Sequence, residues 1–342
     1  MKFGPVSLVD AEGGILAHSL HLGGLSLKKG RRLSDDDLAS LREAGVETVT
    51  VAGPEAGDVD EDAAAARIAE ALADENIRAE RPFTGRVNLL AAARGLLKYD
   101  PAGLDGLNLV NEAITIAALP SLDPVEPGRM VATVKIIPFF VPGALLDQAV
   151  ARARELQFQA VAYRPSAVGL VQSILPGTRK KVLEKTAKVL RTRVERLASR
   201  LAADHRCEHE AEAIADAIRR QIEKGFDLIL VAGASAITDR RDVVPTTIER
   251  AGGKVLHFGM PVDPGNLILL GQVGAIPVVG IPGCARSPKL NGFDWVLGRL
   301  LSGIPVTSED IMRMGSGGLL SRNGAEEARE ALAGSAAKGR VA

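Results

Sequence analysis

The segment VAGASAITDRRDVVP, residues 231–245, combines residue types that bind anions. Its small residues let backbone N–H groups approach a ligand closely. Hydroxyl groups can donate hydrogen bonds to phosphate oxygens, and guanidinium groups can neutralise their charge. A connection that only joins a strand to a helix needs little more than a glycine and a cap. The segment therefore predicts a phosphate-binding loop, with candidate ligands Gly233, Ala234, Ser235, Thr238, Arg240 and Arg241.

Two other segments of the second half have the same character. QSILPGTRKK follows a predicted strand at 167–173, and PGCARSPKLNG follows one at 276–281. Because ligands of parallel sheets bind at the carboxyl ends of the strands, we expect 173–179, 233–242 and 282–289 to form one anion pocket. The added candidate ligands are Ser173, Pro282, Gly283, Arg286, Ser287 and Lys289.

Two carboxylates, Asp239 and Asp242, lie among these basic residues. Beside a phosphate such carboxylates are unexpected unless they hold a cation or cap the next helix. The alternative roles are structural. Asp242 precedes Pro245 by three residues, which suits a helix cap, and Asp239 can pair with a neighbouring arginine in solvent. The sequence leaves both alternatives open.

Two further clusters are interpreted as structural. The predicted helix at 179–202 is mostly basic on its surface, which is typical of a solvated face, and only Lys180 and Lys181 are expected near a ligand. HRCEHE places His205, Cys207 and His209 at a spacing of two residues. Since a zinc site takes four ligands and no fourth partner is nearby, we expect no metal there.

The elements that position the three loops are those of an α/β fold. Predicted strands at 167–173, 226–232, 254–260 and 276–281 alternate with helices, which predicts a parallel sheet with helices on both faces. We expect this three-layer domain to span 166–320. The predicted helices cover 179–202, 210–225, 245–253 and 293–303.

Around this domain we expect two other regions. Residues 1–165 predict a mixed α+β region, in which Ser34 caps a helix that begins with three aspartates and ends at Gly45. Residues 321–342 contain few large apolar side chains, which predicts a flexible tail.

Composition excludes several classes of partner. Lys plus Arg equals Asp plus Glu at 42 each, and aromatic residues make up 3% of the 342-residue chain, so we expect neither a nucleic-acid nor a membrane partner. The chain shows no secretory signal and no apolar run long enough for a membrane span. The two cysteines, Cys207 and Cys284, lie far apart, which indicates a reducing compartment and predicts a cytoplasmic protein.

The loops also carry a family resemblance. DLILVAGASAITDRRDVVPTTIERAGG resembles the signature of molybdopterin-binding proteins of molybdenum-cofactor biosynthesis, with Gly233, Ala234, Ser235, Arg241, Asp242 and Pro245 at the matching places. HFGMPVDPGN and GIPGCARS resemble two further segments of that family, and the resemblance covers about 166–320. More loosely, the N-terminal GGILAHSL…VETVTV is similar to the larger molybdopterin molybdotransferases, which include the gephyrin class.

The resemblance implies a molybdopterin ligand, held through its phosphate by Ser235 and the Gly233–Ala234 backbone and closed over by Pro282–Ser287. In an enzyme it implies Mg²⁺ on Asp242, with Asp239 or Glu210, for adenylylation of molybdopterin or for molybdate insertion. The departures are Ala234 for a glycine, His209 and Glu210 where acidic residues commonly precede the second helix, and Asn266 for a lysine.

The alternative function is a non-catalytic carrier or chaperone that delivers the cofactor to a molybdoenzyme or to another assembly protein. We also expect a homo-oligomer. An unrelated dinucleotide-binding enzyme is disfavoured, because no Gly-x-Gly-x-x-Gly follows a strand with an acidic residue about twenty positions further on.

Overall fold

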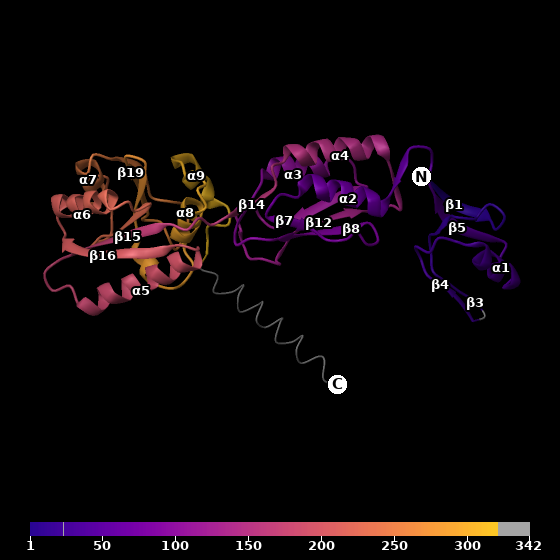
Figure 1. Ribbon diagram of the computed structural model, residues 1–342, viewed down its shortest axis with the longest axis horizontal. Helices are drawn as coiled ribbons and strands as arrows, with labels where there is room; N and C mark the ends of the chain where they lie inside the picture. Colours follow the sequence, from indigo (N-terminus) through magenta and orange to yellow (C-terminus); the bar gives the residue numbers. More distant parts are fainter. Residues whose placement is uncertain (23, 321–342) are drawn as a thin grey trace, which may run out of the picture. The chain divides into compact units, whose positions relative to one another are not determined.

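The computed structural model describes residues 1–22 and 24–320 and consists of two compact units (Figure 1). The first unit comprises Met1–Ala162 and the second Tyr163–Ala342. The tail predicted at 321–342 lies outside the described residues. All three predicted loops belong to the second unit, so the first is described briefly.

The first unit begins with a small sheet of order β1-β5-β2 that shares a core with one helix. Helix α1 starts at Ser34, whose hydroxyl accepts the N–H of Asp37 while the Asp37 carboxylate accepts the N–H of Ser34. This reciprocal cap confirms the predicted start of the helix. The elements are β1 Lys2–Ser7, β2 Ile15–Leu16, β3 Leu20–Leu22, β4 Leu25–Leu27, α1 Asp35–Glu43 and β5 Thr48–Gly53.

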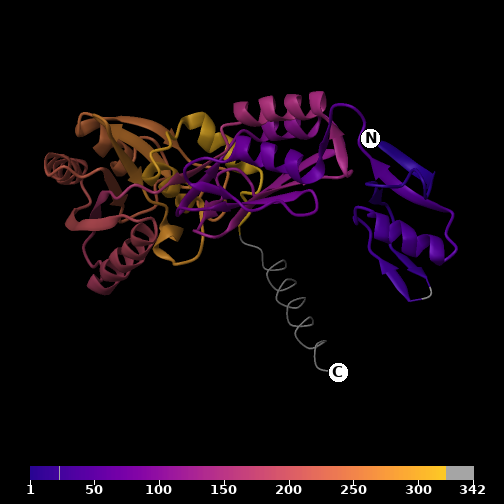
Figure 2. The ribbon, with the colours of Figure 1, turned by 45° about the vertical axis from the view of Figure 1, so that its right-hand side comes forward.

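The rest of the first unit is built on an antiparallel sheet of order β10-β12-β8-β7. Helices α2, α3 and α4 share its core, where Ile68 of α2 and Leu146 of α4 are fully buried. Figure 2 shows α2 and α4 side by side. The elements are β6 Asp58–Asp60, α2 Glu61–Leu72, β7 Ile77–Ala79, β8 Arg86–Ala91, β9 Gly95–Lys98, α3 Pro101–Asn108, β10 Ile114–Ala118, β11 Pro124–Val125, β12 Met130–Ile136, β13 Phe140–Pro142, α4 Gly143–Glu155 and β14 Gln159–Ala162.

The second unit has a six-stranded sheet of order β16-β15-β17-β20-β19-β18. The first four strands in this order run parallel, and β19 is antiparallel to both of its neighbours. The elements are β15 Ala167–Ile174, α5 Lys180–Arg196, β16 Arg200–Glu208, α6 Ala211–Glu223, β17 Leu228–Ala232, α7 Val243–Arg250, β18 Lys254–Phe258, β19 Leu269–Val273, β20 Ile276–Gly280, η1 Gly283–Arg286, α8 Gly292–Leu301, α9 Ser308–Met312 and η2 Arg313–Gly315.

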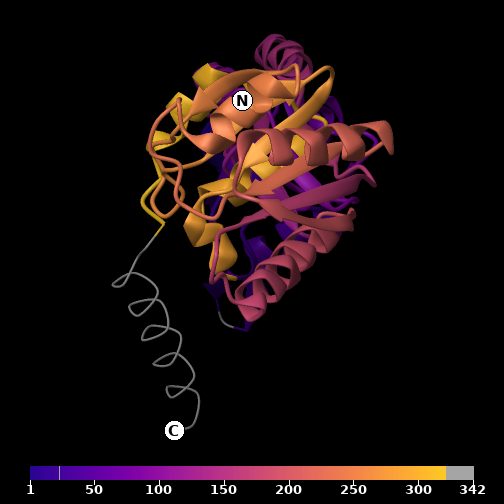
Figure 3. The same ribbon diagram turned by 90° about the vertical axis from the view of Figure 1, so that its left-hand side faces the viewer.

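Helices cover both faces of this sheet, because its central strands are apolar on both sides. Leu190 of α5 and Phe293 of α8 pack with Leu170 in one buried cluster, whereas Ile218 of α6 packs with Val171 in the other. Figure 3 shows α5 and α6 on opposite sides of the strands. The predicted α/β class and three-layer arrangement are confirmed.

Two details of the second unit differ from the prediction. The helix predicted to reach residue 202 ends at Arg196, because Ala198 adopts a left-handed conformation with φ 55° and β16 begins at Arg200. The sheet also contains β19, a strand that the sequence analysis missed, so it is mixed rather than wholly parallel.

Gly169 in the middle of β15 allows close packing against the sheet. A Cβ built there would meet the Gln221 side-chain oxygen and would lie 2.7 Å from Cδ2 of Phe226. Gln221 is held in place, because its amide donates to the Leu170 carbonyl. We predict that Gly169→Ala lowers the free energy of unfolding by about 1–3 kcal/mol, the usual cost of overpacking a core, in urea titrations.

Gly53→Ala is the matched control, because Gly53 also lies in a strand and a Cβ there would meet no atom within 4 Å. A Gly169→Ala protein as stable as the control variant would show that the Gln221 and Phe226 side chains can move away freely.

Candidate functional site

The three loops follow adjacent strands, because β15, β17 and β20 are neighbours and parallel. The N–H of Ala234 in the second loop donates to the hydroxyl of Ser173 at 2.9 Å. Nη2 of Arg286 in the third loop donates to the carbonyl of Gly233 at 2.5 Å. The predicted segments therefore meet at one sheet edge, and we refer to 173–179, 233–242 and 282–289 as the three-loop site.

Ser173 lies at the base of this site. It is 2% exposed, and its hydroxyl is bonded to Ala234 and to Nδ1 of His209 at 2.8 Å. β15 is buried on both faces along almost its whole length, so Ser173 near its end is covered. Ser173 therefore fixes the second loop from below, and its hydroxyl is not open to solvent as a ligand-binding group would be.

The second loop is anchored at Ile237, which is buried against Gly280 at the end of β20. Gly233 is buried, and a Cβ there would lie 3.1 Å from the carbonyl oxygen of Ser235. Ala234 does not have the positive φ that would favour glycine at this position. Alanine therefore fits where the family commonly has glycine, and Ser235 stands exposed at the loop surface.

Asp239 is paired with Arg241 in solvent. Arg241 donates to the Asp239 carboxylate from Nε at 2.8 Å, from Nη2 at 3.3 Å and from its backbone N–H at 2.8 Å. These hydrogen bonds lower the pKa of Asp239 to about 2 and raise the pKa of Arg241. Asp239 therefore has the alternative role named in the sequence analysis, pairing with a neighbouring arginine, and the Arg241 guanidinium is occupied by this pairing.

Asp242 is the N-cap of α7. One carboxylate oxygen accepts the N–H of Val243 at 2.7 Å, and the other accepts the N–H of Thr238 at 3.3 Å. Each oxygen keeps a lone pair, and Mg²⁺ needs only one or two protein carboxylates beside phosphate and water. Asp242 thus fits a single magnesium ligand as well as a cap.

The third loop is pinned from α5. Arg193, buried in that helix, donates from Nη2 to the carbonyls of Ser287 at 2.5 Å and Lys289 at 2.8 Å, and it forms an ion pair with Asp294. The chain from Pro282 enters the short helix η1 at Gly283, where a Cβ would meet no atom within 4 Å. The loop is thus held at its far end and open at Gly283.

Arg286 is a half-buried cation of the third loop that contacts the second loop. Its Nε is buried without a hydrogen-bond partner, and burial lowers the pKa of its guanidinium. Within the described residues it makes no ion pair with a carboxylate. A half-buried cation without a counter-charge is suited to an anionic ligand.

His209 is a site residue whose role the sequence analysis missed. It follows β16, and its two ring nitrogens contact Ser173 at 2.8 Å and Ser235 at 3.3 Å. The only signal in the sequence was its place where acidic residues are common. In residues 1–22 and 24–320 no group of three or more His, Cys, Asp and Glu side chains could hold a metal ion.

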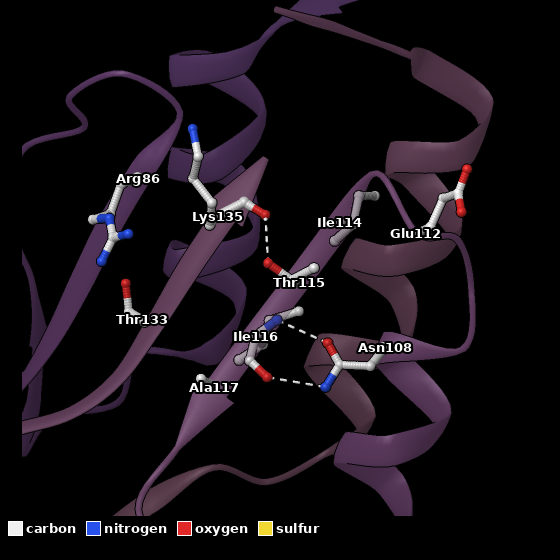
Figure 4. Close-up of a pocket in the computed structure, with 9 residues that line it drawn as sticks. All are labelled: Arg86, Asn108, Glu112, Ile114, Thr115, Ile116, Ala117, Thr133 and Lys135. Atoms are coloured by element: carbon white, nitrogen blue, oxygen red, sulfur yellow. Dashed lines mark hydrogen bonds between the residues drawn. The ribbon is translucent and has the colours of Figure 1, made fainter. Parts of the chain in front are cut away.

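Two cavities lie away from the three-loop site. One, of about 240 Å³, lies beside β16 and α6, where Arg220 and Lys224 line it. The other, of about 400 Å³, lies in the first unit on the sheet β10-β12-β8 (Figure 4). There the Asn108 side chain bonds both backbone groups of Ile116 on the outer strand, at 2.9 and 2.8 Å.

No helix in the described ranges could span a bilayer.

The Asp239–Arg241 pair generates a prediction about titration. Because the folded-state pKa is below the ordinary 3.8, the pair favours the ionised carboxylate, and its contribution disappears as pH falls through about 2. Arg241→Ala should raise the Asp239 pKa toward 3.8, measured by NMR of the side-chain carboxyl carbon. Arg240→Ala is the control and should leave it unchanged. An Asp239 pKa near 3.8 in the unmodified protein would contradict the pairing.

Solved structures of molybdenum-cofactor biosynthesis proteins are similar to this chain. No curated protein matches the sequence. A molybdenum cofactor biosynthesis protein from Pyrococcus furiosus is 13% identical with a TM-score of 0.26, and the match covers 89% of this chain and 66% of that one. This chain therefore spans about two thirds of the length of that protein.

Two other solved structures are also similar. A molybdopterin biosynthesis MoeA protein from Pyrococcus horikosii is 12% identical with a TM-score of 0.31, covering 89% of this chain and 76% of that one. A putative molybdenum cofactor biosynthesis protein from Corynebacterium diphtheriae is 18% identical with a TM-score of 0.30, covering 44% of this chain and 99% of that one.

Two family models match separate parts of the chain. Residues 5–53 match a domain of unknown function. Residues 154–302 match the model described as a probable molybdopterin binding domain, and this range contains all three loops. The resemblance predicted from the loop sequences is thereby confirmed: residues 154–302, most of which lie in the second unit, are similar to this molybdopterin-binding family.

Proposed function

We propose that the three-loop site binds molybdopterin, or a derivative of it, through its terminal phosphate during molybdenum-cofactor biosynthesis. The observation that supports this most is Arg286, a half-buried cation with an unpartnered Nε and no carboxylate partner among the described residues. A phosphate supplies the missing charge and several acceptor oxygens at once.

Neighbouring groups would complete the phosphate site. Ser235 is exposed and offers its hydroxyl, while the Gly233–Ala234 backbone lies between it and Arg286. Ser287 and the open backbone at Gly283 would line the other side. Ser173 supports this arrangement from below, through its bond to the Ala234 N–H.

In the enzymatic form of the proposal, the protein is a transferase for adenylylation of molybdopterin or for molybdate insertion. Asp242 would hold Mg²⁺, which when bound neutralises phosphate charge during transfer. Of the two aspartates of the second loop, Asp242 is the one available to this cation, since Asp239 is bonded to Arg241.

The second candidate function is a carrier that delivers the cofactor to a molybdoenzyme or to another assembly protein. Two observations favour it. His209 stands where the family commonly has an acidic residue, and it is bonded to two serines. Asp239 is engaged with Arg241. A carrier needs the phosphate-binding groups but not a catalytic metal.

Binding of molybdopterin by the purified chain tests the proposal, measured by fluorescence or calorimetric titration. Ser235→Ala should weaken binding about fivefold, the effect of losing one hydrogen bond of roughly 1 kcal/mol. Arg286→Ala should weaken it further and reduce its salt dependence, because a charge is lost. Arg196→Ala, an exposed arginine on α5, is the control. Unchanged binding in both site variants would exclude these loops from the site.

Asp242→Asn separates the two forms of the function. Asparagine caps a helix about as well as aspartate, so the melting temperature should change little. If Asp242 holds Mg²⁺, turnover with molybdopterin, ATP and Mg²⁺, or with molybdate, should fall by orders of magnitude, because a neutral amide binds this cation poorly. Stoichiometric binding without turnover in the unmodified protein would establish the carrier, and turnover that survives Asp242→Asn would identify Asp242 as a cap alone.

A further inference from the structure

A chain of hydrogen bonds runs under the three-loop site and ends at its surface. The N–H of Ala234 meets the Ser173 hydroxyl at 2.9 Å, and that oxygen lies 2.8 Å from Nδ1 of His209. The other ring nitrogen, Nε2, lies 3.3 Å from the hydroxyl oxygen of Ser235. His209 thus connects a buried serine to an exposed one.

The hydrogen bonds of Ser173, at the buried end of this hydrogen-bond chain, determine which ring nitrogen of His209 carries the proton. The Ser173 oxygen must accept from Ala234, because a backbone N–H can only donate. Ser173 is 2% exposed, so its own hydrogen needs a partner, and Nδ1 of His209 is the one acceptor within reach in the described structure. Nδ1 is therefore unprotonated, and the neutral imidazole carries its hydrogen on Nε2.

This assignment also determines the direction of the hydrogen bond between His209 and Ser235. Nε2–H donates to the Ser235 oxygen, so the Ser235 hydrogen is free to point away from His209. We propose that His209 is a positioning residue that turns the Ser235 hydroxyl outward as a donor, so that the site selects a group with only acceptor oxygens, such as a phosphate. This inference rests on the proposed function for the identity of the ligand as a pterin phosphate.

A carboxylate at position 209 would act in the opposite way. An ionised carboxylate only accepts, so it would take the hydroxyl hydrogens of both Ser173 and Ser235. The Ser235 lone pairs would then face the ligand, and a negative charge would lie beside a phosphate. Such a site would need a further cation, in addition to Arg286, to offset this charge, whereas a neutral histidine adds no charge to offset.

The proton assignment can be tested without a ligand. In protein labelled with ¹⁵N at histidine, NMR should show His209 as the neutral tautomer with hydrogen on Nε2. The chain has 5 histidines, and the resonance that disappears in His209→Gln identifies the residue. A tautomer with hydrogen on Nδ1 would overturn the inference, whatever the ligand is.

A double-mutant cycle tests the positioning role, with inorganic phosphate and with molybdopterin as separate probes, both in EDTA. His209→Ala and Ser235→Ala should each weaken binding about fivefold, and the double variant should be no weaker than either, because both remove the same donor. Additive losses would show that His209 acts on the fold rather than on Ser235, and would overturn the inference.

Two substitutions at position 209 refine the test. His209→Gln keeps one acceptor and one donor and should remain within about threefold of the unmodified protein, whereas His209→Asp should weaken binding of phosphate at least about tenfold, the effect of a lost charge-assisted hydrogen bond. Equal binding by His209→Asp would overturn the inference. If phosphate follows this order but molybdopterin does not bind, the proposed function fails and the positioning role stands.

Discussion

The parallel alignment of β15, β17 and β20 is the constraint on which the site depends. Because the three strands point the same way and lie side by side, their following loops must leave the sheet at one edge. Two hydrogen bonds, Ser173 to Ala234 and Arg286 to Gly233, then join the loops in sequence order. Arg193 holds the third loop from a helix 94 positions earlier in the chain. These contacts hold the three loops together, so that their hydrogen-bond donors lie at fixed positions on one surface.

Local signals in the sequence were sufficient for much of this fold. Ser34 and the aspartates after it specify a cap through contacts within three residues, and the short apolar run at 228–232 predicts the buried strand that is observed. The end of α5 could not be predicted, because Ala198 takes a left-handed conformation without being glycine. β19 lies antiparallel between two strands, and that pairing depends on neighbours rather than on its own residues.

The contact between the three segments could be predicted from the sequence, whereas the environment of each side chain could not. Residue type and strand order indicate that the loops meet, but they do not indicate which serine faces inward. Ser173 is covered because β15 is buried on both faces, whereas Ser235 is exposed in the loop that follows β17. The role of His209 depends on its distances to Ser173 and Ser235, which lie in two other segments of the chain. The sequence indicated only that the residue type at this position is unexpected.

Asn108 has a consequence for the first unit as a whole. The outer strand of a sheet presents unpaired backbone groups to which another chain can attach. The carboxamide of Asn108 has one donor and one acceptor in the geometry of a peptide group, and it occupies both backbone positions of Ile116. It therefore takes the place of a neighbouring strand at Ile116, so that the backbone of this residue is not available for pairing with a second chain.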